Sequence, residues 1–259
     1  MNNPRGPVIT FLLLLVIEAF LFLYFPPAFL MEPSLTAGGD TPSHFMSAVA
    51  MHHPASIFSP VTWVFGNFAG FPLFLQYFPF PFALMGLISW LVSLQVSFKL
   101  VTLLAILPLP PAVFYCLRRL GFREPSPILG AVLSLPFLFM TENHMWGGNI
   151  ASTLAGEFAF GISFVLAIML TGRVYADAPR GRSLASNSFI EALVAFSSGY
   201  PILHFGMGTG FLLLRGGCSR YILSMHALAF GLIAFWILPL VYFSRWNAPF
   251  AHWWSFQTP

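Results

Sequence analysis

Two stretches of this sequence decide its fold: residues 8–24, VITFLLLLVIEAFLFLY, and residues 221–243, YILSMHALAFGLIAFWILPLVYF. Both are almost continuously apolar, whereas the strands of a membrane β-barrel alternate between apolar and polar residues. Such runs are typical of helices that cross the hydrocarbon core of a bilayer, which is about 30 Å thick. The sequence therefore predicts an all-α fold, a polytopic bundle of transmembrane helices.

The composition of the chain indicates the same class of protein. Of the 259 residues, 58% are hydrophobic and only 7% are charged, and the mean hydropathy is +0.81. A soluble domain would carry roughly 25% charged residues, so most of this chain must face lipid or other helices. The values exclude an ordinary soluble protein, and we expect membrane lipid rather than nucleic acid as a partner.

The basic residues orient the chain in the membrane. Most of them form three clusters: Arg118, Arg119 and Arg123; Arg173, Arg180 and Arg182; Arg215 and Arg220. Lys and Arg concentrate in cytoplasmic loops, so we place these clusters and the N-terminus, with Arg5, in the cytoplasm. Residues 32–81 and 141–156 contain no Lys or Arg and are placed outside. The expected location is the inner, cytoplasmic membrane of a prokaryotic cell.

These positions predict about seven crossings within a single transmembrane domain, residues 1–259. The expected crossings are residues 7–31, 95–117, 125–140 and 157–174, a tight hairpin of two short helices within 187–214, and residues 221–243. Residues 32–94 contain the first outside loop and a segment, 82–94, that is too short to span and is expected as a juxtamembrane or re-entrant helix. The prolines at 108, 110 and 111 predict a kink inside one crossing.

The first outside loop contains a candidate catalytic pair, Asp40 and His44. Two glycines before Asp40 predict a turn, and Pro42 predicts a helix whose N-cap is Asp40 or Thr41. At a spacing of four residues the carboxylate and the imidazole would lie close together, as a general base or as two ligands of a divalent metal ion. The alternative is that Asp40 only caps the helix and His44 is an interfacial ring.

The second outside loop carries a further group of polar side chains. They are Glu142, His144, Trp146 and Asn149, followed by Glu157 at the start of the next helix. The pair Gly147-Gly148 would let the backbone approach a ligand closely, and the helix dipole favours an acid at the position of Glu157. The alternative is a polar turn with an N-terminal acid.

Three further features concern lipid contact or transport. The aromatic and proline-rich residues 67–82 are expected in the headgroup layer, either against a lipid tail or as an anchor. Glu18 and Glu191 lie within expected helices, where a carboxylate must be protonated, paired or facing a cavity. Glu18 would fit a proton path in a transporter. His204, which follows the hairpin turn at 197–201, would face the outside.

Four groups of short motifs carry a family resemblance: Gly38-Gly39-Asp40 ahead of His44, Tyr77 to Pro81, Trp146 to Ser152 leading into Leu154 to Phe158, and Gly199-Tyr200-Pro201. Together they resemble the polytopic membrane proteins of the GT-C glycosyltransferase superfamily. Within it, the sequence is most similar to the membrane region labelled 6-pyruvoyl-tetrahydropterin synthase-related. The resemblance covers most of the chain.

The resemblance implies an enzyme that transfers a sugar from a polyprenyl-phosphate-linked donor at the outer face of the membrane. It implies that an acid of the first outside loop, here Asp40, acts as general base or helps to bind a metal ion, Mg²⁺ or Mn²⁺. The candidate catalytic residues are then Asp40, His44 and Glu142, with Asp40 and His44 as metal ligands. The candidate substrate-binding residues are Lys99, His144, Trp146, Asn149, Glu157, His204 and Arg245.

Two other classes of function stay open. Members of the superfamily usually have more spans and often a soluble C-terminal domain, so the chain is interpreted as a short relative, a fragment, or a subunit that keeps only the scaffold. The main alternative is a non-catalytic structural or assembly subunit that binds other membrane proteins. The third is a small transporter.

Overall fold

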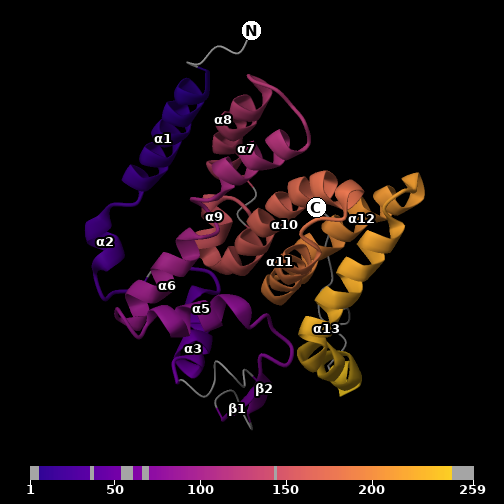
Figure 1. Ribbon diagram of the computed structural model, residues 1–259. Helices are drawn as coiled ribbons and strands as arrows, with labels where there is room; N and C mark the ends of the chain where they lie inside the picture. Colours follow the sequence, from indigo (N-terminus) through magenta and orange to yellow (C-terminus); the bar gives the residue numbers. More distant parts are fainter. Residues whose placement is uncertain (1–5, 36–37, 54–60, 66–69, 143–144, 247–259) are drawn as a thin grey trace, which may run out of the picture.

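The computed structural model describes residues 6–35, 38–53, 61–65, 70–142 and 145–246. Most of them are helical (Figure 1). The helices are α1 (Gly6–Tyr24), α2 (Pro27–Met31), α3 (Thr41–Met51), α5 (Phe80–Ile88), α6 (Leu94–Leu103), α7 (Leu109–Arg119), α8 (Ser126–Leu138), α9 (Ile150–Ser152), α10 (Phe158–Asp177), α11 (Leu184–Ser197), α12 (Gly199–Arg215) and α13 (Ser219–Phe243). A π-helical turn (Thr153–Glu157) joins α9 to α10, and short 3₁₀ turns follow α10 (Ala178–Arg180) and α13 (Ser244–Trp246). The strands β1 (Thr62–Val64) and β2 (Phe71–Leu73) form an antiparallel pair.

Helix α10 lies at the centre of the bundle, where it packs against α6, α7, α11 and α12. Small residues permit close contact between these helices. A Cβ added to Gly161 would lie 2.5 Å from the Cβ of Ala105, and one added to Gly172 would lie 2.8 Å from the Cα of Cys116. Helix α13 packs on α11 at one side of the molecule, and α1 runs along the opposite side, beside α7 and α8 (Figure 1).

Local sequence determines where the helices break. Helix α7 begins at Leu109 with Pro110 and Pro111 in its first turn, where the missing N–H groups need no partner. The crossing expected over 95–117 is therefore two helices, α6 and α7, as the prolines predict. Ser198 has extended backbone between α11 and α12, which confirms the predicted hairpin turn.

The described residues of the predicted first outside loop form a layer at one end of the bundle. Helices α3 and α5 and the pair β1–β2 lie together there, at the bottom of Figure 1. Helix α3 packs on α5 and α6, and Phe82, Phe98 and Phe158 are among the buried side chains of their shared core. The indole N–H of Trp236, on α13, donates a hydrogen bond of 2.7 Å to the carbonyl of Phe74 and so joins the last helix to this layer.

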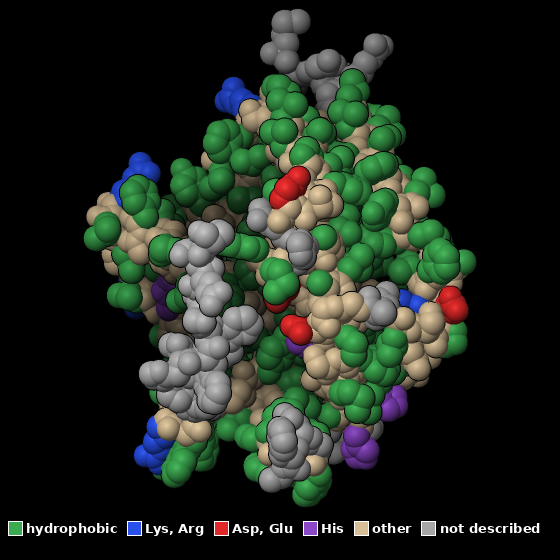
Figure 2. Space-filling model, turned by 180° about the vertical axis from the view of Figure 1, so that it is seen from behind, with side chains coloured by type: hydrophobic (Ala, Val, Ile, Leu, Met, Phe, Trp, Pro, Cys, Tyr) green, Lys and Arg blue, Asp and Glu red, His purple; other side chains and the backbone are tan. Residues whose placement is uncertain are grey.

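The surface of the helices is strongly apolar. Hydrophobic side chains cover most of the face drawn in Figure 2, and on the outer helices Val16, Leu23 and Phe235 are 65%, 75% and 62% exposed. Two helical segments, Ile150–Arg180 and Ser219–Trp246, are long and apolar enough to cross a membrane. An apolar surface this extensive is typical of contact with lipid.

Three of the expectations can be compared with the structure. Within the described ranges two helical segments have the length and hydropathy of a crossing, and the other apolar stretches, Val8–Tyr24 of α1 among them, have 10–17 residues, so seven crossings stays a prediction. The all-α class becomes a mostly helical fold with one β-hairpin, because residues expected in the headgroup layer pair as β2 with β1. The juxtamembrane helix expected over 82–94 is α5, which ends at Ile88 because a turn precedes Ser93, the N-cap of α6.

Candidate functional site

The two outside loops meet at the start of α3. The amide of Asp40 donates a hydrogen bond of 2.8 Å to the carbonyl of Ala155, and the hydroxyl of Thr41 donates one of 2.9 Å to the carbonyl of Leu154. Both carbonyls belong to the π-helical turn Thr153–Glu157, in which the chain leaves regular helical geometry. The broken turn thus supplies the acceptors that hold the first outside loop in place.

Two glycines make this contact possible. Gly39 has a φ of 49°, and a Cβ there would lie 2.1 Å from the carbonyl oxygen of Ala155. Gly156 has a φ of 128°, and a Cβ there would lie 3.1 Å from the Cβ of Asp40 and 3.1 Å from the Cδ2 of His44. L side chains rarely adopt positive φ, so both positions favour glycine twice over. Asp40 and His44 therefore both lie against Gly156, the residue before Glu157.

Asp40 occupies the N-cap position of α3, as predicted, but its side chain makes no capping hydrogen bond. The side chain is exposed. The helix-cap interpretation therefore explains the position of this residue in the backbone, but it does not explain the carboxylate. That carboxylate is accessible to a ligand at the surface where the two loops meet.

His44 is half-buried and contacts Tyr77. Its Nε2 lies 3.3 Å from the Tyr77 hydroxyl, and its ring packs against Phe82 and Phe158 with centroid distances of 5.9 and 5.5 Å. Burial lowers the pKa of His44, and the negative charge of Asp40 partly opposes this change. The imidazole is therefore held in its neutral form near pH 7, with one ring nitrogen as a hydrogen-bond acceptor.

The pKa of Tyr77 is influenced by burial and by two acids, Glu157 and Asp40. Burial raises the pKa of Tyr77, and the charges of Glu157 and then Asp40 raise it further. The phenol thus stays protonated and can donate to His44. Asp40, His44, Tyr77 and Glu157 form one cluster, which we call the acidic cluster.

An apolar cavity of about 380 Å³ lies near the acidic cluster and is linked to it through Leu154. Leu154, whose carbonyl binds Thr41, lines it together with residues of α2, of the segments that flank α2, and of α6. Lys99 also lines the cavity and is 8% exposed. Its ammonium donates to the carbonyls of Phe29 and Glu32 at 2.5 and 2.6 Å, which accounts for two of its three N–H groups.

Several other predicted site residues are not joined to the acidic cluster by any contact among the described residues. Glu142 and Trp146 are exposed in the second loop. His204 is exposed on α12, with its Nδ1 2.9 Å from the carbonyl of Tyr200. The guanidinium of Arg245 lies over the aromatic rings that flank it along the chain.

Asn149 has a structural role, whereas the prediction for His144 is not tested. Asn149 is buried, and its side-chain oxygen accepts a hydrogen bond of 2.8 Å from the amide of Ser152 as the N-cap of α9. It therefore shapes the turn that leads to Gly156. His144 lies outside the described residues.

Metal binding at Asp40 and His44 stays a prediction. Within the part of the chain that the structure describes, no three His, Cys, Asp or Glu side chains are arranged so that they could hold a metal ion together. Mg²⁺ is often held by one or two carboxylates together with substrate phosphates, and Asp40 and Glu157 are the acids available for that arrangement. These residues alone do not provide a complete ligand set.

Tyr77 and the cavity are the parts of the site that sequence reasoning missed. Tyr77 belongs to an aromatic stretch that was expected in the headgroup layer, against a lipid tail or as an anchor, and nothing in its spacing relates it to His44. The cavity combines segments from both ends of the predicted first outside loop, which no local pattern indicates. The motif Tyr77 to Pro81, which carries part of the family resemblance, was a signal available for Tyr77.

Comparison with known proteins places the chain in a family. A family model described as 6-pyruvoyl-tetrahydropterin synthase related domain, a membrane protein, matches residues 75–255, more than two thirds of the chain. The match includes Tyr77, Lys99 and Glu157 and begins after Asp40 and His44. No curated protein and no solved structure matches the chain. The chain therefore belongs to the 6-pyruvoyl-tetrahydropterin synthase-related family of membrane proteins.

Proposed function

We propose that the protein is a GT-C-like membrane glycosyltransferase, which transfers a sugar from a polyprenyl-phosphate-linked donor at the outer face of the cytoplasmic membrane. One observation carries this proposal. The exposed, uncapped carboxylate of Asp40 lies at the start of α3, where the Asp40 amide and the Thr41 hydroxyl bind a broken helical turn, and Leu154 of that turn lines an apolar cavity that contains a buried lysine. An accessible acid near an apolar cavity with a cation suits a lipid-phosphate donor.

Asp40 is the general base in this proposal. Its carboxylate accepts the proton of the acceptor hydroxyl while the hydroxyl oxygen forms a bond to the anomeric carbon of the sugar. The bond between that carbon and the phosphate oxygen breaks, and the electron pair leaves with the lipid phosphate. In this proposal His44 and Tyr77 position the base, because His44 lies with Asp40 against Gly156 and Tyr77 contacts the His44 ring.

Lys99 is the candidate partner of the lipid phosphate. A leaving phosphate is stabilised by positive charge in a site that excludes water. Lys99 lines the cavity beside Leu154, and the remaining wall is mostly apolar, which suits a polyprenyl chain. The two carbonyls that bind its ammonium hold the charge in one place.

The proposal is tested by donor turnover in membranes that contain the full chain. Undecaprenyl-phosphate-linked glucose and mannose serve as donors, and released undecaprenyl phosphate is measured by mass spectrometry. We expect Asp40→Asn to lower turnover by about 10²–10⁴-fold, the usual contribution of a general base. Expression level and thermal unfolding should stay unchanged, because the side chain makes no capping bond.

Glu124→Gln is the matched control. Glu124 is an acid outside the acidic cluster, in a 4.0 Å ion pair with Arg118, and such a surface pair contributes little to stability. This variant should turn over donor at the wild-type rate. Full turnover by Asp40→Asn would remove Asp40 from the reaction, and an absence of turnover by the wild type with both donors would contradict the proposed donor class.

A further inference from the structure

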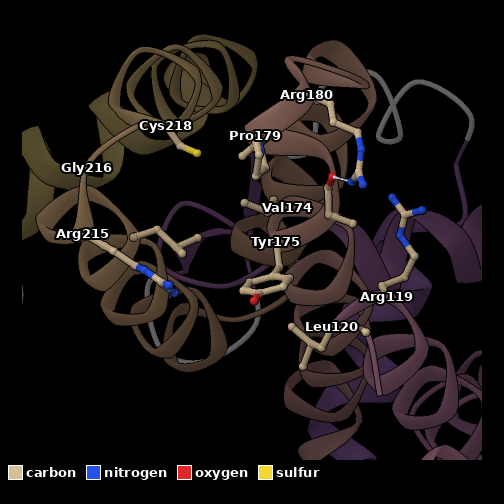
Figure 3. Close-up of a pocket in the computed structure, with 13 residues that line it drawn as sticks. Arg119, Leu120, Val174, Tyr175, Pro179, Arg180, Arg215, Gly216 and Cys218 are labelled. Atoms are coloured by element: carbon tan, nitrogen blue, oxygen red, sulfur yellow. Dashed lines mark hydrogen bonds between the residues drawn. The ribbon is translucent and has the colours of Figure 1, made fainter. Parts of the chain in front are cut away.

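A second cavity, of about 630 Å³, lies at the far end of α10 (Figure 3). Three arginines line it: Arg119 at the end of α7, Arg180 after α10 and Arg215 at the end of α12. The 20 residues of α10 correspond to about 30 Å of helix, and this length separates the cavity from Gly156. We call this cavity the basic cavity.

The arginines of the basic cavity differ in their hydrogen-bond and ion-pair partners. Arg119 forms an ion pair with the buried Asp177, and Arg180 donates a hydrogen bond of 2.5 Å to the carbonyl of Ala176. Arg215 has no acidic partner within 4.0 Å among the described residues. Its exposed side chain reaches from α12 toward Tyr175 in Figure 3. The carbonyl ends of α10 and α12 oppose an anion here, so attraction must come from the arginines, and Arg215 is the one with neither a hydrogen bond nor an ion pair among the described residues.

The basic cavity continues into an apolar one. An adjoining cavity of about 170 Å³ lies between α10 and α12, and Arg215 and Tyr175 line both. The apolar cavity is lined further by Phe205, Gly208 and Phe211 of α12. Phe205 precedes Arg215 by about 15 Å along the helix axis, so the apolar cavity runs away from the basic one toward the middle of the bundle.

The two cavities lie at different depths relative to the candidate membrane spans. The span Ile150–Arg180 ends at the basic cavity, and the span Ser219–Trp246 begins directly after Cys218, which lines it. The basic cavity is therefore at the level where two spans leave the hydrocarbon, and the apolar cavity is within it. An anionic headgroup above an acyl chain has the same arrangement, and basic pockets between membrane helices bind such lipids.

We propose that these cavities bind one phospholipid with an anionic headgroup, its phosphate at Arg215 and one acyl chain between α10 and α12. The site does not depend on glycosyl transfer at the opposite end of α10. A free phosphate would use the basic cavity alone, whereas a phospholipid fills both cavities. The continuity of the two cavities favours the phospholipid.

The test uses the purified full chain in detergent, with palmitoyl-oleoyl-phosphatidylglycerol as the probe. Native mass spectrometry counts bound lipid, and thermal unfolding reports stabilisation. We expect phosphatidylglycerol to bind and to raise the unfolding temperature more than phosphatidylcholine or glycerol 3-phosphate. Arg215→Gln should weaken phosphatidylglycerol binding about tenfold, because a charge-assisted hydrogen bond is lost. Arg220→Gln, an exposed arginine outside the cavity lining, should bind as the wild type does.

Gly208→Leu tests the acyl chain separately. A Cβ at Gly208 meets no atom within 4 Å, so the leucine can occupy the apolar cavity without a clash and should reduce phosphatidylglycerol binding. Gly206→Leu is its control, since Gly206 is equally open but does not line the cavity. Equal stabilisation by phosphatidylcholine, equal stabilisation by glycerol 3-phosphate, or unchanged binding in both Arg215→Gln and Gly208→Leu would each overturn the proposal.

Discussion

The two ends of α10 use their charged side chains differently. At the first end, Asp40 and Glu157 are exposed beside a broken helical turn, and no Lys or Arg lies within 4.0 Å of either among the described residues. At the far end, Asp177 is buried, pairs with Arg119 and receives a hydrogen bond of 3.4 Å from Asn187.

This difference indicates which charged side chains stabilise the fold and which are available to a ligand. Buried polar groups with complete partners hold helices together, and at the far end Asn187 bridges Arg173 on α10 and Tyr221 on α13 at 2.6 and 2.8 Å. Accessible charges without partners contribute little to folding and are suited to a ligand. We therefore expect substitutions at the acidic cluster to change activity first, and substitutions of the buried, hydrogen-bonded side chains at the far end to change stability first.

The largest effect is expected where the outside loops touch. A Cβ at Gly39 would lie 2.1 Å from the carbonyl of Ala155, so Gly39→Val should displace Asp40 and lower donor turnover by about 100-fold, as small misplacements of catalytic groups do. Gly38→Val is the control, because Gly38 also has positive φ but meets nothing within 4 Å. Equal turnover in the two variants would show that the contact does not position Asp40.

The next effect should appear at the far end, in stability alone. Asn187→Leu leaves Arg173 and Tyr221 without their shared partner and should destabilise the protein by about 1–3 kcal/mol, measured by unfolding in detergent. Turnover per folded molecule should stay at the wild-type level. Ser186→Ala, which removes one exposed hydrogen bond of Arg173, should have a much smaller effect. A loss of turnover without a loss of stability in Asn187→Leu would contradict the stabilising role assigned to Asn187.

A third substitution tests the one lysine at the first end. Lys99→Met removes the buried charge from the cavity that Lys99 and Leu154 line and should weaken binding of undecaprenyl phosphate about tenfold, a change expected for a lost charge-assisted contact. Isothermal titration in detergent measures the affinity. Lys99→Arg keeps the charge and should restore most of the binding. Wild-type affinity in Lys99→Met would exclude Lys99 from the phosphate site.

The smallest expected effect is a pH dependence at His44. Burial lowers the pKa of His44 in the folded protein, whereas the unfolded chain binds this proton near the ordinary pKa of about 6.5. The unfolded state therefore binds more protons below that pH, and stability falls as the pH decreases from 7 to 5. His44→Gln should show a shallower fall in unfolding temperature over this range. Parallel curves for the two proteins would contradict the assigned burial.

Sequence reasoning succeeded where structure follows from local chemistry. The helix start at Asp40, the break at Ser198 and the proline-bounded start of α7 each depend on a few neighbouring residues. The positive-inside rule also grouped Arg119, Arg180 and Arg215 on one side, and the structure brings all three to one cavity.

Sequence reasoning failed where distant segments decide the outcome. Strand β2 lies in an aromatic run whose pattern resembles a membrane anchor, yet it pairs with β1. Of the two acids predicted in or next to the second loop, Glu157 is beside Asp40 and Glu142 is not joined to it by any described contact. Nothing in the sequence favoured one acid over the other, because the number of residues between two positions does not predict the distance between them when two loops pack together.

By itself, the sequence determined the membrane class and the helix breaks, because hydrophobicity, proline and glycine act over short distances. Only the tertiary structure decided which polar groups cooperate. Thr41 and Leu154 are 113 positions apart and share a hydrogen bond, because Gly39 and Gly156 let two backbones approach. That approach depends on how the helices pack, and it places Asp40, His44, Tyr77 and Glu157 in one acidic cluster.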